Sequence, residues 1–262
     1  MHEPRTLGRP DVQRSRRLSL ARIVRGASIA AVLAITWFLS GAGGLAGDSA
    51  GRAGGAAVAH PDDSTRPAAV WRSARATVAG TYLPDMIAAG HSHLKRWPDR
   101  RGAPIRVWIE PGDSVPGWQP AFDDTVRAAF VSWERIGLPV RFAFTPTPDG
   151  SEVRVSWTER LPARNSGIIR WRGDGEGWLT EATIELATEV SDGTSANLAS
   201  VWRIALHEIG HLLGLEHSTD AGDVMAPWVV TGRLSARDEA TARLLYALPV
   251  GEVPTEPMDA TS

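Results

Sequence analysis

The chain has 262 residues, of which 43% are hydrophobic, and a formal net charge of −2. This length allows one medium-sized domain with a proper core and some additional segments. A net charge so close to zero argues against nucleic-acid binding, which usually requires a basic surface. The sequence contains no cysteine, which excludes disulfides, thiolate metal ligands and thiol nucleophiles.

The first 47 residues have the pattern of a targeting segment. Seven arginines within residues 1–25 precede an uncharged run over residues 26–47. A basic flank before an apolar run is typical of a signal peptide or an uncleaved signal anchor. We therefore expect export across the cytoplasmic membrane, with membrane contact only through this segment. Cleavage after Ala46, cleavage after Ala59 and retention as an anchor all stay open, as does the weaker alternative of a buried N-terminal helix.

Residues 48–100 are expected to form a linker and an N-terminal extension. The part up to about residue 66 is rich in Gly, Ala, Asp and Ser, which is typical of a flexible linker. His91 and His93 stand two residues apart, a spacing that makes their side chains diverge on a helix and favours a solvated pair over a metal site. Several apolar residues beyond the linker predict a short helix that leans on the domain: Tyr82, Leu83, Met86, Ile87, Leu94 and Trp97.

Residues 101–250 show the regular hydrophobic patterns of one folded domain, and residues 251–262 are expected to be a disordered tail. The predicted strands cover 105–110, 140–145, 153–157 and 178–187, and the predicted helices cover 120–137, 197–213 and 236–247. This order is typical of an α+β domain with a mixed sheet. Ser235 and Asp238 have the spacing of a capping box at the start of the last helix. The strand over 178–187 is polar on one face, which suits an exposed or edge position.

Three of the seven histidines lie within eleven residues, from His207 to His217. His207 and His211 are four residues apart, so a helix places them on one face, where two neutral imidazoles can bind one Zn²⁺. The same helix face cannot supply His217. Gly214 allows the chain to turn back, because glycine accepts a positive φ at no steric cost. Three histidine ligands leave one tetrahedral position open, which is typical of a catalytic zinc.

Glu208 follows the first ligand but points about 100° around the helix, so it need not bind the metal. A carboxylate there can take a proton from a zinc-activated water during attack on a peptide carbonyl and return it to the leaving amine. A purely structural zinc site has no use for such a residue. The competing interpretation is that these are histidines without function on an amphipathic helix. It is much weaker, because three histidines, one glutamate and one glycine all stand at the spacing that a catalytic zinc site requires.

The sequence HEIGHLLGLEH resembles the metzincin zinc-binding motif, whose family also carries a methionine turn. Met225 follows His217 by eight residues and is placed for that turn. Within the metzincins, Ser218, the MAP tripeptide at 225–227 and the closing LSARDEATARLLY are similar to matrixins, in particular to a bacterial matrixin-family peptidase. The resemblance implies a zincin catalytic domain, with a twisted mixed sheet packed on an active-site helix and a C-terminal helix.

The same resemblance implies that an extended peptide binds along the edge strand of the sheet, for which residues 178–187 are the candidate. The pocket wall after the methionine turn would be formed by Pro227, Trp228 and Val229. Matrixins often have Pro-x-Tyr there, so the pocket preference does not carry over.

Three features depart from the matrixin pattern. Without cysteine there is no cysteine switch, and no histidine lies in the strand region to bind a second, structural zinc. Calcium is the alternative second metal, through Asp174, Glu176 and Asp192, although acidic loop residues are usually only solvated. Asp220 and Asp223 either hydrogen-bond a ligand histidine or serve the turn.

These features predict an exported, monomeric zinc endopeptidase. His207, His211 and His217 would bind one Zn²⁺, Glu208 would act as general base and acid, and Met225 would shape the floor of the site. The partner would be a protein or peptide substrate, with no nucleic acid. The alternative from another class is a non-catalytic, zinc-stabilised peptide-binding module tethered to the membrane.

Overall fold

The computed structural model describes residues 78–190 and 192–253. The predicted targeting segment, residues 48–77 of the predicted linker and N-terminal extension, and residues 254–262 of the predicted tail lie outside the described residues. The first residues of that tail are ordered, because Gly251–Glu252 form a short strand. None of the helices in the described ranges is both long enough and apolar enough to cross a membrane.

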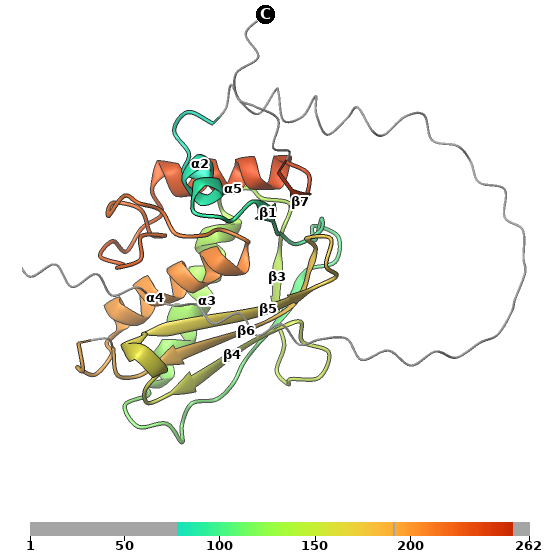
Figure 1. Ribbon diagram of the computed structural model, residues 1–262. Coiled ribbons are helices and arrows are strands. Elements are labelled where there is room, and N and C mark those ends of the chain that lie inside the picture. Colours follow the sequence, from blue (N-terminus) through green and yellow to red (C-terminus); the bar gives the residue numbers. More distant parts are fainter. Residues whose placement is uncertain (1–77, 191, 254–262) are drawn as a thin grey trace, which may run out of the picture. The chain divides into compact units, whose positions relative to one another are not determined.

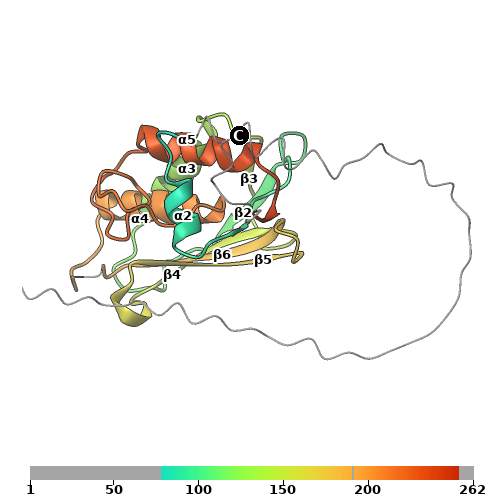
Figure 2. The ribbon, with the colours of Figure 1, turned by 45° about the horizontal axis from the view of Figure 1, so that its top comes forward.

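A five-stranded mixed sheet forms one layer of the domain (Figures 1 and 2). Its strand order is β3-β2-β4-β6-β5, in which β3, β2, β4 and β6 run parallel and β5 is antiparallel to β6. This arrangement confirms the predicted α+β class with a mixed sheet. The strands are β2 (Ile105–Ile109), β3 (Phe142–Phe144), β4 (Val153–Thr158), β5 (Gly167–Gly173) and β6 (Leu179–Ala187).

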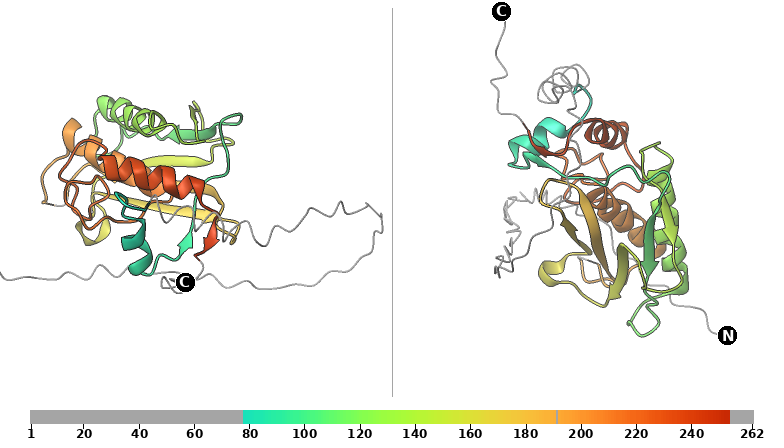
Figure 3. Two further views of the ribbon diagram at one scale, coloured as in Figure 1. Left: turned by 90° about the horizontal axis from the view of Figure 1, so that it is seen from above. Right: turned by 90° about the vertical axis from the view of Figure 1, so that its right-hand side faces the viewer.

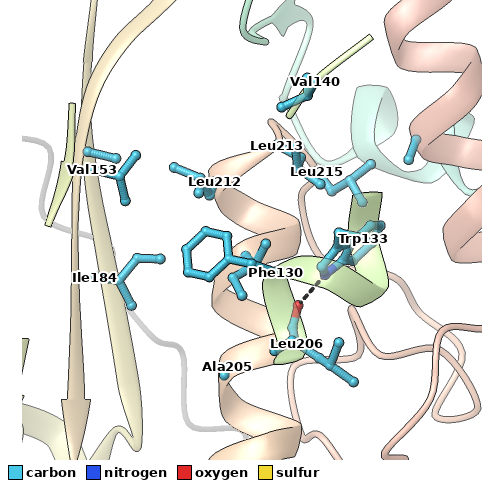
Figure 4. Packing of buried hydrophobic residues seen from close by; sticks show 14 of the residues in the cluster. Phe130, Trp133, Val140, Val153, Ile184, Ala205, Leu206, Leu212, Leu213 and Leu215 are labelled. Carbon is cyan, nitrogen blue, oxygen red and sulfur yellow. Dashed lines mark hydrogen bonds between the residues drawn. The ribbon is translucent and has the colours of Figure 1, made fainter. Parts of the chain in front are cut away.

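Three long helices lie on the same side of this sheet (Figure 2). They are α3 (Pro120–Glu134), α4 (Leu198–Leu212) and α5 (Ala236–Ala247). Two of them, α3 and α4, contact the strands of the sheet. Figure 4 shows how α3 joins the layers: Phe130 points toward Val153 and Ile184 of the sheet, and the Trp133 indole N–H donates to the Leu206 carbonyl of α4 at 2.9 Å. Phe130 and Trp133 are fully buried, and each burial of this kind contributes about 1.5–3 kcal/mol. The core thus holds α4 at a fixed height above the sheet.

Side-chain caps fix where the two site-bearing helices begin. Asn197 and Ser200 form a reciprocal capping box at α4, with Asn197 Oδ1 accepting from the Ser200 N–H at 3.0 Å. Ser235 and Asp238 do the same at α5, which confirms the prediction from their spacing. A satisfied N-cap contributes about 1 kcal/mol and fixes the direction in which the chain enters the helix.

The prediction that residues 178–187 form the edge strand is wrong. β6 lies between β4 and β5, and the antiparallel β5 is the edge. The polar face of β6 carries Glu185 and Glu181, which pair across to Arg170 and Arg172 of β5 at 3.4 Å each. That face is polar because it is exposed to solvent, and an exposed face looks the same in sequence as an edge position. No strand had been predicted at β5.

The described part of the predicted N-terminal extension packs beside α5 (Figure 3). It contains α2 (Leu83–Ala88) and β1 (His93–Leu94), and β1 pairs antiparallel with β7 (Gly251–Glu252). The expected short helix is present as α2, whereas Leu94 and Trp97 lie beyond its end. The Tyr82 N–H donates to Thr241 Oγ1 of α5 at 3.0 Å. The two ends of the described chain therefore meet on the same side of the domain.

Candidate active site

The three motif histidines come together at the C-terminal end of α4. His207 and His211 project from the last turns of this helix, and His217 comes from the chain that follows it. Each ring offers a nitrogen, and these atoms all lie within 4.8 Å of one another. In the part of the chain that the structure describes, these residues are the only group of three or more suited to hold a metal ion.

Hydrogen bonds to backbone carbonyls decide which ring nitrogens of the two helical histidines carry a proton. His207 Nδ1 lies 2.8 Å from the Val224 carbonyl oxygen, and His211 Nδ1 lies 2.7 Å from that of Leu215. A carbonyl can only accept, so both Nδ1 atoms donate and both Nε2 atoms keep a free lone pair.

The two Nε2 atoms lie 3.1 Å apart, with lone pairs facing each other and no proton between them. Two nitrogens bound to a tetrahedral zinc at 2.0–2.1 Å would be separated by about 3.3 Å. Burial lowers the pKa of His207 to about 4 and that of His211 well below its usual value. The imidazoles are therefore neutral at pH 7, the form that binds metals, and their spacing fits one zinc ion.

The turn that brings His217 to the site depends on Gly214. This residue has φ +97°, outside the range that other residues adopt readily. A Cβ at Gly214 would also lie 1.9 Å from the Lys95 carbonyl oxygen. The position therefore requires glycine for two independent reasons, the backbone conformation and the approach of a distant segment.

Met225 lies directly under the ligand helix and is fully buried. A Cβ at Gly210 would come within 2.2 Å of Met225 Sδ and 3.1 Å of the Trp133 ring. Gly210, between the two helical histidines, thus leaves the space that the methionine occupies. The Ser218 N–H also donates to the Met225 carbonyl at 2.8 Å, which closes the loop between the third histidine and the methionine.

A buried carboxylate on α5 holds this loop from behind. Asp238 has no exposed surface and accepts from the backbone N–H groups of Val224 at 2.9 Å and Met225 at 3.4 Å. The peptide group between those two residues turns its carbonyl to His207 Nδ1. Asp238 therefore orients the acceptor that orients a candidate ligand. Burial raises the pKa of Asp238, and its hydrogen bonds with Ser235 and Val224 oppose that shift.

Asp220 and Asp223 serve the turn and do not contact the histidines. Asp223 is buried, accepts from the hydroxyls of Ser218 and Ser235, and lies 3.3 Å from an Arg237 nitrogen. Asp220 Oδ1 accepts from the Gly222 N–H at 2.8 Å. Of the two roles considered for these aspartates, the structure shows the turn role.

Glu208 lies on α4 with only 6% of its surface exposed. A Cβ at Gly167, the first residue of the edge strand, would lie 2.5 Å from Glu208 Oε1. The carboxylate therefore lies between α4 and the start of β5. Burial alone raises its pKa to about 8. A buried carboxylate without a protein cation nearby is costly to ionise, which is typical of a group that functions with a bound cation or substrate.

The predicted pocket wall follows the methionine directly. Pro227 and Trp228 are exposed, with Trp228 exposing 68% of its surface, and Val229 is partly buried against the core. The Trp202 indole N–H of α4 donates to the Gly232 carbonyl at 2.6 Å and ties this loop to the helix. The role of these residues as a pocket wall stays a prediction.

The acidic residues considered for calcium lie in two separate loops. Asp174 accepts from the N–H groups of Glu176 and Trp178, and Asp192 accepts from the N–H and hydroxyl of Thr194. The nine residues of β6 separate these loops, and the eight steps of about 3.3 Å between its first and last Cα atoms span roughly 26 Å. A single calcium ion cannot bind all three predicted ligands.

Three residues that shape the site were missed as such from the sequence: Gly167, Gly210 and Asp238 in its role toward the methionine turn. A signal existed for Gly210, because a glycine inside a strongly predicted helix is unfavourable and indicates a close approach. Gly167 had no comparable signal, since its strand was not predicted. Asp238 was predicted only as a cap.

Three imidazoles on a helix and its returning turn, over a mixed sheet, form a candidate site for one metal ion with three histidine ligands. The sequence profile of the matrixin family matches residues 117–247, and the chain belongs to this family.

Two curated relatives agree with that assignment. A matrix metalloproteinase-C from Caenorhabditis elegans is 30% identical over 137 residues, which cover 44% of this chain and 22% of the relative. A putative matrix metalloproteinase from Heliothis virescens ascovirus 3e is 28% identical over 126 residues, which cover 40% of this chain and 25% of the relative. The similarity thus spans about a quarter of the length of either relative.

Proposed function

We propose that the protein is an exported zinc endopeptidase in which His207, His211 and His217 bind one catalytic Zn²⁺. The observation that carries the proposal is the pair of Nε2 lone pairs facing each other at 3.1 Å, beside a third imidazole. Two buried lone pairs repel each other unless a cation lies between them. Membership of the matrixin family supports the same metal and the same general activity.

When bound, the zinc ion would supply Lewis-acid activation of a water molecule and of the scissile carbonyl. Glu208 is the group we assign to proton transfer: it would accept a proton from the attacking water and then deliver it to the nitrogen of the leaving amine. Its high pKa without a nearby cation shows how strongly burial favours its protonated form. A positive charge close by would restore the carboxylate that the first step requires. No covalent intermediate is formed.

The substrate we propose is an extended stretch of protein or peptide. β5 is an edge strand that starts beside Glu208, and an extended chain added to it would bring a peptide bond toward the carboxylate. Trp228 and its neighbours Pro227 and Val229 would form the wall of a side-chain pocket, with Met225 beneath the metal. We expect the chain to act as a monomer, delivered by its N-terminal segment.

The test of the proposed function is the variant Glu208→Gln. It keeps the size of the side chain but cannot accept a proton, so we expect one zinc per chain to remain bound and cleavage of an unfolded protein substrate to fall by at least about 10²-fold. Wild-type protein treated with a chelator and then reloaded with zinc is the control. Undiminished cleavage by Glu208→Gln would refute the mechanism. Zinc binding by the wild type without cleavage of any peptide in a broad library would favour the non-catalytic binding module.

A further inference from the structure

A segment outside the motif, Tyr82–Trp97, is built into the domain core; we call it the strap. The Trp97 indole N–H donates to the Leu212 carbonyl at the end of α4, at 2.9 Å. The Tyr82 hydroxyl lies 3.3 Å from Asp238 Oδ1, the carboxylate behind the methionine turn. Five strap residues are at most 2% exposed: Tyr82, Leu83, Met86, Leu94 and Trp97. Side chains buried to this degree cannot be withdrawn without opening the core.

The strap contacts the turn on both sides of His217. Before the histidine, the Lys95 carbonyl lies against Gly214, so close that a Cβ there would be 1.9 Å away. Also before it, His91 Nδ1 lies 3.6 Å from Glu216 Oε1. After it, the Thr219 hydroxyl donates to Asp85 Oδ2 at 3.2 Å.

His217 is the candidate ligand that most needs such support. The rings of His207 and His211 are each oriented by a hydrogen bond from Nδ1 to a backbone carbonyl. For His217, no such bond comes from any residue in the described ranges. Its ring lies against the other two imidazoles, at centroid distances of 5.2 and 4.9 Å. The place of this ring therefore depends on the backbone turn, and the turn is held by the strap.

We propose that the strap is a positioning element for the third zinc ligand, acting through the turn at residues 214–219. The proposal rests on the proposed function, since it takes His217 as a ligand. It assigns a site-related role to residues that lie far from the motif in sequence and precede the matched family region. A corollary is that the active enzyme keeps the strap, so removal of N-terminal residues must stop before Tyr82.

The test compares two histidines of the same strap. His91 faces Glu216 of the turn, whereas His93 faces Glu252 of β7 at 3.2 Å, away from it. We would measure the zinc dissociation constant by competition with a chromophoric chelator, using the 262-residue chain with Glu208→Gln to prevent self-cleavage. The double variant Asp85→Ala/His91→Ala should bind zinc about tenfold more weakly. His93→Ala should change the constant by less than about twofold, as expected for an exposed pair.

Two further measurements separate positioning from plain stability. The thermal midpoint of the metal-free protein should fall by similar small amounts in His91→Ala and His93→Ala, because both lose one partly exposed pair. Asparagine places an N–H near the position of His91 Nδ1. In a chain that keeps Asp85, His91→Asn should therefore bind zinc more tightly than His91→Ala and about as tightly as the background protein. If the double variant does not fold, the single variant His91→Ala replaces it in the zinc measurement. The His91 side chain is 31% exposed, so its removal should not disturb the core.

The outcomes are distinguishable. Weaker zinc binding in the strap variants, with His93→Ala unchanged and His91→Asn recovered, supports the proposal. Equal zinc affinity in all variants overturns it and leaves the proposed function intact. A background protein that binds no zinc, before any change in the strap, overturns the proposed function itself.

Discussion

The two halves of the candidate metal site are built in different ways. His207 and His211 stand on α4, so the helix repeat alone brings them together, and the N-cap at Asn197 fixes where that repeat begins. His217 belongs to a loop that depends on distant residues: Lys95 lies against Gly214, and Asp238 holds Val224 and Met225. Local periodicity positions the first half, and long-range contacts position the second.

The loop half of the site is more easily disrupted than the helical half. A change on the exposed side of α4 leaves the helical pair in place, because the helix is stabilised by its own hydrogen bonds and by the core under it. A change far from the metal can displace the loop, because distant residues such as Lys95 and Asp238 hold it. The loop half should therefore couple metal binding to the stability of the whole domain.

The largest expected effect comes from removing a ligand in either half. His211→Ala on the helix and His217→Ala on the turn should each weaken zinc binding by more than the about 10–100-fold that loss of an outer partner costs. Zinc stoichiometry after dialysis against a weak chelator measures this. Retention of zinc by His217→Ala, with loss of zinc from His211→Ala, would mean that the helix holds the metal without the turn.

A smaller but still large effect should follow Gly214→Ala. The new Cβ meets the Lys95 carbonyl and forces a strained φ, so we expect a loss of about 3 kcal/mol in the free energy of unfolding. Urea denaturation of the metal-free protein gives this value. The matched control is Gly102→Ala, where a Cβ meets nothing within 4 Å. Equal stability of the two variants would show that the turn is not held as described.

The smallest expected effect is a pH dependence that Asp238→Asn should remove. Burial raises the pKa of Asp238 above its unfolded value, so its contribution to stability is fully present below the unfolded pKa of about 3.9. That contribution is lost as the pH rises through the folded pKa. The stability of wild type relative to Asp238→Asn should therefore decrease with rising pH in that window, as followed by urea unfolding of the metal-free proteins. A constant difference would show that folding does not raise the pKa of Asp238.

The sequence predicted the helical half of the site well and the loop half only in outline. The spacing of His207 and His211 sufficed for one helix face, and the Ser235 and Asp238 pattern predicted the start of α5. The sequence did not predict the role of Lys95 in holding the turn, because the contact between residues 95 and 214 depends on the fold and not on any local pattern.

The edge strand shows a second limit of the sequence. The alternation in β6 revealed which face meets solvent, but not which neighbours lie on either side. That information depends on strand order. After β5 the chain turns back, and β6 pairs between β4 and β5, which leaves β5 at the edge. The substrate edge was therefore assigned to the wrong strand, although both strands belong to the same hairpin.

The most direct test of the central claim is anomalous diffraction at the zinc absorption edge, from crystals of the zinc-loaded chain. The account predicts one strong peak about 2 Å from a ring nitrogen of each of His207, His211 and His217. It also predicts that Nε2 is the ligand atom for His207 and His211, because their Nδ1 atoms face backbone carbonyls. A peak within bonding distance of the two helical histidines but not of His217, or no peak at this site, would contradict the account.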